Sequence, residues 1–240
     1  LINEIADNHR YGTLADGATG NLAHGMLIED VEMTGVVLFA ADANTLRSVS
    51  CEDNGWGWYL EDSHDNELLG VWAYSNDQEG FYLSGSTGNV LDDVETGWNG
   101  NTGYYVTEGS DDNTLVDVGS RSDGAYGILV EGVSGTSVFN ASVGDAVMDG
   151  IATWTSWQTT FVALSISGSD YNGLFGMYTV DVTAVDVLTA SNDEDGVHFS
   201  DGSDGVTLLD ITAVDNHDDG IELHNTLAGG TLGAVLANTV

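Results

Sequence analysis

A histidine and two carboxylates near the C-terminal end of the chain have the side-chain types needed for acid–base chemistry. They are His198, Asp219 and Glu222. His198 and Glu222 each lie two residues after a glycine, and they are 24 residues apart. A histidine beside carboxylates can transfer protons near neutral pH or bind a metal ion. These three are therefore candidate catalytic residues, and the alternative is a solvated acidic face with incidental histidines.

Aspartates are concentrated around the same residues. Asp193, Asp195, Asp215 and Asp219 fall in two acidic stretches that end just before a glycine. Carboxylate oxygens are the ligands that Ca²⁺ prefers. The spacing of these aspartates matches no calcium-loop motif, so two interpretations stay open. One is a bound Ca²⁺ ion held by these four residues, and the other is a bare acidic surface.

Aromatic residues occupy the position of His198 and Glu222 at other glycines. They are Tyr59, Tyr82, Tyr105 and Phe175. Aromatic faces can stack on sugar rings while tyrosine hydroxyls add polar contacts, so we predict ligand binding here. Rings in register can also simply stabilise neighbouring strands. Three tryptophans in nearby repeats are predicted to widen this platform: Trp56, Trp72 and Trp98.

The elements that position these residues follow from a glycine that recurs every 22–24 residues. The repeated glycines are Gly12, Gly35, Gly57, Gly80, Gly103, Gly127, Gly150, Gly173, Gly196 and Gly220. The first and third residues after the glycine are mostly apolar, which is the alternation of a β-strand. Asparagine follows four of the glycines at a turn position, as Asn44, Asn66, Asn89 and Asn113. Asparagines in register can form a ladder of amide hydrogen bonds between repeats.

Each repeat therefore predicts one coil of short strands separated by turns. A single coil cannot bury its own inner face, so the coils must stack on one another. Leucine-rich repeats have a similar length, but their helix-forming half is missing here. We predict about ten coils in one domain over residues 12–240, with residues 1–11 as an N-terminal lead-in or cap.

The repeats GWGWYLEDSHDNELLGVWAYSNDQEG and GFYLSGSTGNVLDDVETGWNGNTG resemble those of the pectin-lyase-like superfamily. This resemblance implies an all-β fold, a right-handed parallel β-helix. The superfamily includes polysaccharide lyases, glycosidases, epimerases, viral tailspikes and adhesins, so the resemblance leaves the activity open. No catalytic motif of the lyase, polygalacturonase or epimerase type is recognisable in the chain.

The charge of the chain is strongly negative. It has 39 acidic residues, three arginines and no lysine, for a formal net charge of −36. Repulsion between carboxylates weakens in molar salt, which favours a halophilic protein of the haloarchaeal type or a virus of such a host. The lack of a basic surface argues against nucleic-acid binding. It also disfavours anionic polysaccharides and membranes unless a cation bridges the two.

The two ends and the single cysteine add little to the chemistry. Cys51 has no partner for a disulfide, and we expect it to be a small buried residue. No run of 18 apolar residues is present, so no membrane span is predicted. Residues 226–240 carry no charge, whereas solenoids normally end in a polar cap. We therefore expect the chain to belong to a longer protein or to self-associate through this coil.

These observations favour a β-helix outside the cell, at the surface of a halophile or of a virion. It would act without catalysis as a surface, appendage or receptor-binding module that contacts glycans or a cell-surface partner. Two alternatives stay open. One is a polysaccharide-active lyase, hydrolase or epimerase, and the other is a structural spacer or filament subunit. Ca²⁺ is the one cofactor that the sequence suggests.

Overall fold

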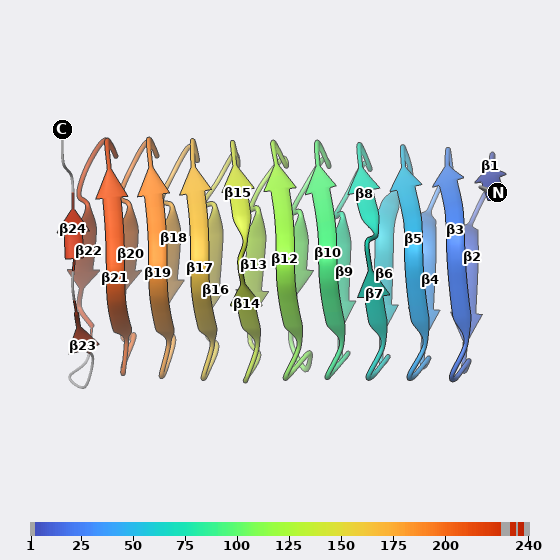
Figure 1. The fold of residues 1–240 in the computed structure, drawn as a ribbon, viewed down its shortest axis with the longest axis horizontal. Helices are drawn as coiled ribbons and strands as arrows, with labels where there is room; N and C mark the ends of the chain where they lie inside the picture. The colour runs from blue at the N-terminus through green and yellow to red at the C-terminus, as the bar shows by residue number, and fades with distance from the viewer. Residues whose placement is uncertain (1–2, 227–230, 234, 238–240) are drawn as a thin grey trace.

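The computed structural model describes residues 3–226, 231–233 and 235–237, and it confirms an all-β parallel solenoid of about ten coils. The coils stand side by side from the N-terminal to the C-terminal end, as Figure 1 shows. Every strand pairing between described residues is parallel, and no described residue lies in a helix. None of the described segments is therefore a helix long and apolar enough to cross a membrane.

Two sheets form the walls of the solenoid. Sheet A has 14 strands and lies in front in Figure 1, and sheet B has 10 strands and lies behind it. The strands of sheet B are β2 (Tyr11–Asp16), β4 (Thr34–Phe39), β6 (Trp56–Glu61), β9 (Phe81–Ser84), β11 (Tyr104–Val106), β13 (Ile128–Glu131), β16 (Ile151–Trp154), β18 (Leu174–Met177), β20 (Val197–Ser200) and β22 (Ile221–His224).

Sheet A contains longer strands, and in three coils a pair of short strands takes the place of one long strand. Its strands are β1 (Asn3–Ala6), β3 (Leu22–Glu29), β5 (Thr45–Glu52), β7 (Glu67–Leu69), β8 (Trp72–Tyr74), β10 (Val90–Gly97), β12 (Thr114–Arg121), β14 (Ser137–Phe139), β15 (Ser142–Gly144), β17 (Thr160–Ser167), β19 (Thr183–Ala190), β21 (Thr207–Val214), β23 (Thr231–Leu232) and β24 (Val235–Ala237). The longer strands bend in the middle at a residue of positive φ, which is Asp93 in β10 and Asp117 in β12.

Aromatic side chains stack inside the solenoid between the two sheets. Trp58 and Phe81 are parallel at 5.5 Å, and Phe81 and Tyr104 at 5.3 Å. All three are buried. Cys51 is also buried in this core, and its burial raises the pKa of the thiol well above its usual value. The apolar residues that alternate after each glycine therefore form one continuous core.

Asparagine ladders hold the turns between coils. The amide of Asn44 donates to Asn66 at 3.0 Å, and that of Asn66 donates to Asn89 at 3.0 Å. Asn89 continues the ladder to Asn113 at 3.1 Å, so the predicted ladder is confirmed. A second ladder, which the sequence analysis missed, lies at the other end of sheet A. Its members are Asn54, Asn76, Asn99 and Asp123.

The two ends differ in how far they are described. Within the expected lead-in over residues 1–11, β1 already pairs in parallel with β3, so the first paired strand precedes Gly12. At the other end, β23 and β24 both pair with β21. The remaining residues of the uncharged segment 226–240, namely 227–230, 234 and 238–240, lie outside the described residues, and self-association through it stays a prediction.

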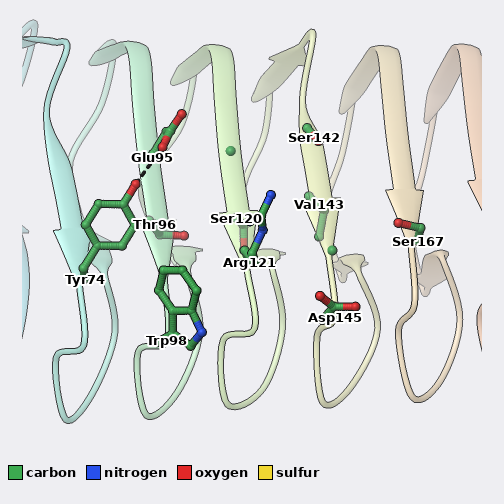
Figure 2. Close-up of a pocket in the computed structure, with 12 residues that line it drawn as sticks. Tyr74, Glu95, Thr96, Trp98, Ser120, Arg121, Ser142, Val143, Asp145 and Ser167 are labelled. Carbon is green, nitrogen blue, oxygen red and sulfur yellow. Dashed lines mark hydrogen bonds between the residues drawn. The ribbon is translucent and has the colours of Figure 1, made fainter.

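The outer face of sheet A is hollowed at the C-terminal ends of β8, β10, β12 and β15 (Figure 2). The hollow has a volume of about 430 Å³ and contains Tyr74, Glu95, Trp98, Arg121 and Asp145.

Candidate functional site

One row of side chains on the outer face of sheet B joins most of the residues that the sequence singled out. We name it the outer column. Its members pair in register as Tyr59, Tyr82, Tyr105, Leu129, Ala152, Phe175, His198 and Glu222. Seven steps of about 4.8 Å between coils give the column a length of roughly 34 Å.

The N-terminal part of the outer column is a stack of tyrosines. The rings of Tyr59 and Tyr82 lie 5.1 Å apart at 18°, and Tyr105 meets Tyr82 edge-on at 5.4 Å. The hydroxyl of Tyr105 donates to Glu131. Burial raises the pKa of Tyr59 and of Tyr105 to about 12, so both phenols stay protonated at neutral pH. All three rings are half-buried, which leaves part of each ring on the surface.

The middle of the outer column is covered by apolar side chains. Leu129, Ala152 and Tyr126 form a small buried cluster, and the partly buried residues that pack against it are Tyr105, Ala125, Met148, Trp154 and Phe175. Tyr126 and Trp154 meet edge-on at 5.6 Å. The indole nitrogen of Trp154 is buried and has no hydrogen-bond partner among the described residues. Strand alternation did not predict this cluster, although Tyr126 lies directly before Gly127, as Asp195 lies before Gly196.

The predicted tryptophan platform is only partly on this face. Trp56 belongs to sheet B and meets Tyr59 edge-on at 6.4 Å. Trp72 belongs to β8, and Trp98 directly follows β10. Both are therefore positioned by sheet A, so the prediction was wrong for these two. The spacing of tryptophans alone does not tell which strand of a coil carries them.

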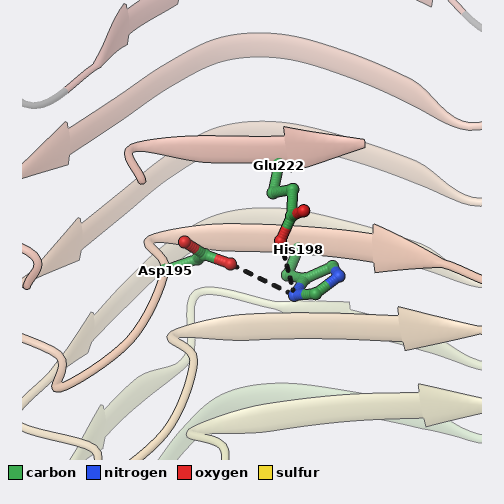
Figure 3. A group of neighbouring side chains, drawn as sticks. All are labelled: Asp195, His198 and Glu222. Atoms are coloured by element: carbon green, nitrogen blue, oxygen red, sulfur yellow. Dashed lines mark ion pairs between the residues drawn. The ribbon is translucent and has the colours of Figure 1, made fainter. Parts of the chain in front are cut away.

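The C-terminal part of the outer column is a histidine held between two carboxylates, shown in Figure 3. His198 Nδ1 lies 3.1 Å from Asp195 Oδ2 and 3.4 Å from Glu222 Oε2. The ring of Phe175 meets the imidazole edge-on at 5.4 Å. His198 Nε2 is buried and without a hydrogen-bond partner among the described residues. We name Asp195, His198 and Glu222 the histidine centre.

The histidine centre includes two of the three predicted catalytic residues. His198 and Glu222 meet as their register predicts. The second carboxylate is Asp195 rather than Asp219, whose side chain is exposed. Asp219 contacts the centre only through its backbone N–H, which donates to Asp195 Oδ1 at 2.7 Å. Asp195 lies three residues before His198, close enough for the turn before β20 to bring them together.

A row of buried polar residues supports the histidine centre from neighbouring coils. Asp149 Oδ1 accepts hydrogen bonds from the backbone N–H and the side-chain amide of Asn172, at 3.0 and 2.8 Å. Asn172 Oδ1 in turn accepts from the Asp195 N–H at 3.2 Å. Burial raises the pKa of Asp149 to about 6 and also raises the pKa of Asp195. A larger fraction of these carboxyl groups is therefore protonated near neutral pH than on an open surface.

The donor set of the histidine centre suits a transition metal better than calcium. One ligand atom from each of its three residues lies within 4.8 Å of the others, and it is the one such group among the described residues. A nitrogen with two carboxylate oxygens is a set that zinc accepts, whereas calcium takes oxygen ligands. Of the four aspartates predicted to bind calcium, only Asp195 belongs to this group. The side chains of Asp193 and Asp215 are exposed.

The histidine centre opens into a shallow pocket of about 420 Å³. The pocket is also lined by Asp193, Glu194, His217 and Asp218. A proton on His198 Nδ1 can pass to either carboxylate, which is the arrangement of an acid–base group. The geometry therefore permits two roles for the outer column: surface contact along its length and proton transfer or metal binding at its C-terminal end.

Comparisons with solved structures find the same architecture in proteins of low sequence identity. The mannuronan C-5 epimerase A-module of Azotobacter vinelandii is 14% identical with a TM-score of 0.64, covering 98% of this chain and 84% of the epimerase module. Pectate lyase Pel9A is 13% identical with a TM-score of 0.64, covering 98% of this chain and 72% of the lyase.

A third similar structure is tailspike protein 2 of Escherichia coli O157:H7 bacteriophage CAB120, at 10% identity and a TM-score of 0.68. The match covers 98% of this chain and 38% of the tailspike. At such identities these likenesses establish the fold alone. No curated protein sequence matches the chain. A family model described as a right-handed β-helix region matches residues 2–135, which is more than half of the sequence. The chain therefore belongs to the right-handed β-helix family.

Proposed function

We propose that this protein is a surface β-helix that binds a glycan along its outer column without catalysis. The observation that carries the proposal is the stack of Tyr59, Tyr82 and Tyr105 on consecutive coils, with each ring half-buried. Rings held in this way present a rigid apolar surface with fixed hydroxyl groups, which suits the faces and hydroxyls of sugars. A column of roughly 34 Å suits an extended polymer better than a small molecule.

The charge of the chain selects among glycans. With a formal net charge of −36, the protein repels an anionic polysaccharide, and its three arginines offset little of this charge. The preferred ligand is therefore a neutral glycan, and an anionic one would need bridging cations. Two similar structures carry names that identify mannuronan and pectate as substrates, which supports a carbohydrate ligand for this fold more than a particular one.

The proposed setting is the outside of a cell or virion in a salty environment. The excess of 39 acidic over three basic residues supports halophily, because carboxylate repulsion is screened over about 3 Å in molar salt but over roughly 10 Å at 0.1 M. Unfolding in urea at rising concentrations of KCl tests this point. The midpoint should rise up to molar salt, and a midpoint that stays constant would contradict halophily.

Cosedimentation with insoluble neutral polysaccharides at molar salt tests the binding. We expect the wild-type protein to be depleted from solution, and Tyr82→Ala to bind roughly tenfold less tightly or worse. Tyr178→Ala is the matched control, because Tyr178 is 53% exposed but lies outside the outer column. Equal loss in both variants, or no binding by the wild type, would contradict the proposal.

A second candidate function is a polysaccharide-active enzyme centred on His198. The specific observation in its favour is the imidazole nitrogen between Asp195 and Glu222, where burial raises the pKa of the Asp195 carboxyl group. Incubation with neutral and anionic polysaccharides at molar salt, followed by analysis of reducing ends, unsaturated sugars and epimer content, distinguishes the two functions. Turnover that Glu222→Gln abolishes would establish the enzyme and overturn the non-catalytic proposal.

A further inference from the structure

The hollow on the outer face of sheet A has a floor of small residues. Two neighbouring outward rows of sheet A run through it in register. One row contains Tyr74, Gly97, Arg121, Gly144 and Ser167, and the other contains Glu95, Gly119 and Ser142. The glycines and serines leave open the space that larger side chains fill elsewhere. The result is a trough of about 430 Å³ along the axis of the solenoid (Figure 2).

An aromatic pair forms one end of this trough. The rings of Tyr74 and Trp98 lie 6.0 Å apart at an angle of 46°. The Tyr74 hydroxyl donates to Glu95 Oε2 at 2.6 Å, which fixes the ring. A Cβ atom on Gly97 would lie 3.2 Å from two atoms of the Tyr74 ring. The absence of a side chain at Gly97 therefore leaves room for this ring.

Trp98 has a backbone conformation that tryptophan rarely adopts. Its φ is 54°, in the left-handed region that favours glycine, asparagine and aspartate. The same corner of neighbouring coils carries Ser75, Ser122 and Asp145, also with positive φ. Trp98 is nevertheless 56% exposed, so burial contributes little to offset the strain. An exposed tryptophan in this conformation adds little to stability, and its ring stays open to a ligand.

Arg121 supplies an unpaired cation in the same trough. It is one of three basic residues in the chain, against 39 acidic ones. Even so, Arg121 forms no ion pair with another described residue. Its guanidinium group offers five N–H donors in a planar fork, while Glu95 and Asp145 in the trough offer acceptors. These groups match the donors and acceptors of sugar hydroxyls.

We propose that this trough is a second carbohydrate site, which binds a neutral oligosaccharide by stacking on Trp98 and Tyr74 and by hydrogen bonds to Arg121, Glu95 and Asp145. An anionic sugar is disfavoured because two carboxylates and one guanidinium group line the trough. The site lies on sheet A, away from the outer column of sheet B, and does not depend on glycan binding there. A protein with both sites holds glycan chains on two faces.

The opposing explanation is that Trp98 only covers the side of Tyr74 and stabilises the coil. The variant Trp98→Ser separates the two, because Ser75 and Ser122 already occupy this corner in the adjacent coils. If Trp98 binds a ligand, the variant keeps or raises its melting temperature and loses affinity. If Trp98 is structural, the melting temperature falls.

The experiment uses the full chain at molar salt, in the Tyr82→Ala background that disables the outer column. The probes are hexasaccharides of β-1,4-linked glucose, mannose and xylose, with hexagalacturonate as the anionic arm. Oxidation of tryptophan by N-bromosuccinimide, mapped by mass spectrometry, is the first readout. We expect a neutral probe to protect Trp98 and leave Trp157 reactive, since Trp157 is 47% exposed outside the trough.

Titration calorimetry is the second readout. The neutral probe that protects Trp98 should bind the Tyr82→Ala protein, and both Trp98→Ser and Arg121→Ala should lower that affinity roughly tenfold or more. Absence of protection by every neutral probe overturns the proposal. Preference for hexagalacturonate, or a lower melting temperature of Trp98→Ser with unchanged affinity, overturns it as well.

Discussion

Tyr59 and Tyr82 stack with their rings 5.1 Å apart and 18° from parallel, on adjacent coils of sheet B. If sugars bind by apolar contact with the outer edges of the stacked rings, Tyr82→Phe should keep most of the affinity for a neutral glycan and Tyr82→Ala should lose it. Binding isotherms at molar salt for the two variants check this. Equal loss in both would show that the hydroxyl, rather than the ring, makes the contact.

The histidine centre should bind zinc and show no specific response to calcium. One imidazole nitrogen and two carboxylate oxygens suit Zn²⁺, whereas Ca²⁺ prefers oxygen ligands alone. The measurement is the rise in melting temperature with each ion, for the wild type and for His198→Ala. The zinc effect should shrink in the variant. A calcium effect that depends on His198, or a zinc effect that does not, would contradict the assignment.

Asp149 should destabilise the fold at neutral pH. Burial raises its pKa from 3.8 to about 6, so the folded state holds the proton more tightly than the unfolded state. Stability from this group is fully present below pH 3.8 and is lost as the pH rises through about 6. At about 1.4 kcal/mol per pKa unit, the difference corresponds to roughly 3 kcal/mol above pH 6.

Asp149→Asn should therefore stabilise the protein above pH 6, because asparagine keeps the oxygen that accepts from Asn172. Urea unfolding of the variant and the wild type between pH 4 and pH 8 checks this. The gain should be at most about 3 kcal/mol at high pH and should vanish at low pH. A gain of the same size at every pH would show that proton linkage is not its cause.

The asparagine ladder should contribute strongly to stability at its centre. Asn89 is fully buried, donates to Ser63 and Asn113, and accepts from Asn66. Asn89→Ala leaves buried polar groups without partners, at about 1–3 kcal/mol each. We expect a loss of about 3 kcal/mol or more in the free energy of unfolding.

The matched control for Asn89→Ala is Asn21→Ala at the exposed N-terminal end of the same ladder. Water replaces the lost contacts there, so the loss should be below about 1 kcal/mol. Chemical denaturation at molar salt measures both variants. Similar losses in the two would mean that the ladder does not depend on burial.

The regular part of the fold was predictable because one glycine per coil marks a repeating strand. The register of that strand places Tyr59 beside Tyr82 and His198 beside Glu222, as the structure confirms. Positions in the turns were harder. Asp195 approaches His198 because the chain bends before β20, and strand alternation does not describe that bend.

Sheet A was less predictable than sheet B. The interval between Asn54, Asn76 and Asn99 is as regular as that of the predicted ladder and would have identified the second one. The trough depends on Gly97, which lets the Tyr74 ring lie over the strand. The alternation of apolar and polar residues along a strand carries no information about space left by a glycine. Neither the trough nor the position of Trp98 could therefore be predicted from that alternation.

Hydroxyl-radical footprinting with mass spectrometry tests glycan binding on the outer column most directly. The protein is labelled at molar salt with and without the neutral polysaccharide that cosediments best, and the tyrosines of the same chain serve as internal controls. We expect protection of Tyr59, Tyr82 and Tyr105, with Tyr178 unchanged. Protection of Tyr178 alone, or no change at the three stacked tyrosines while the polysaccharide is bound, would contradict it.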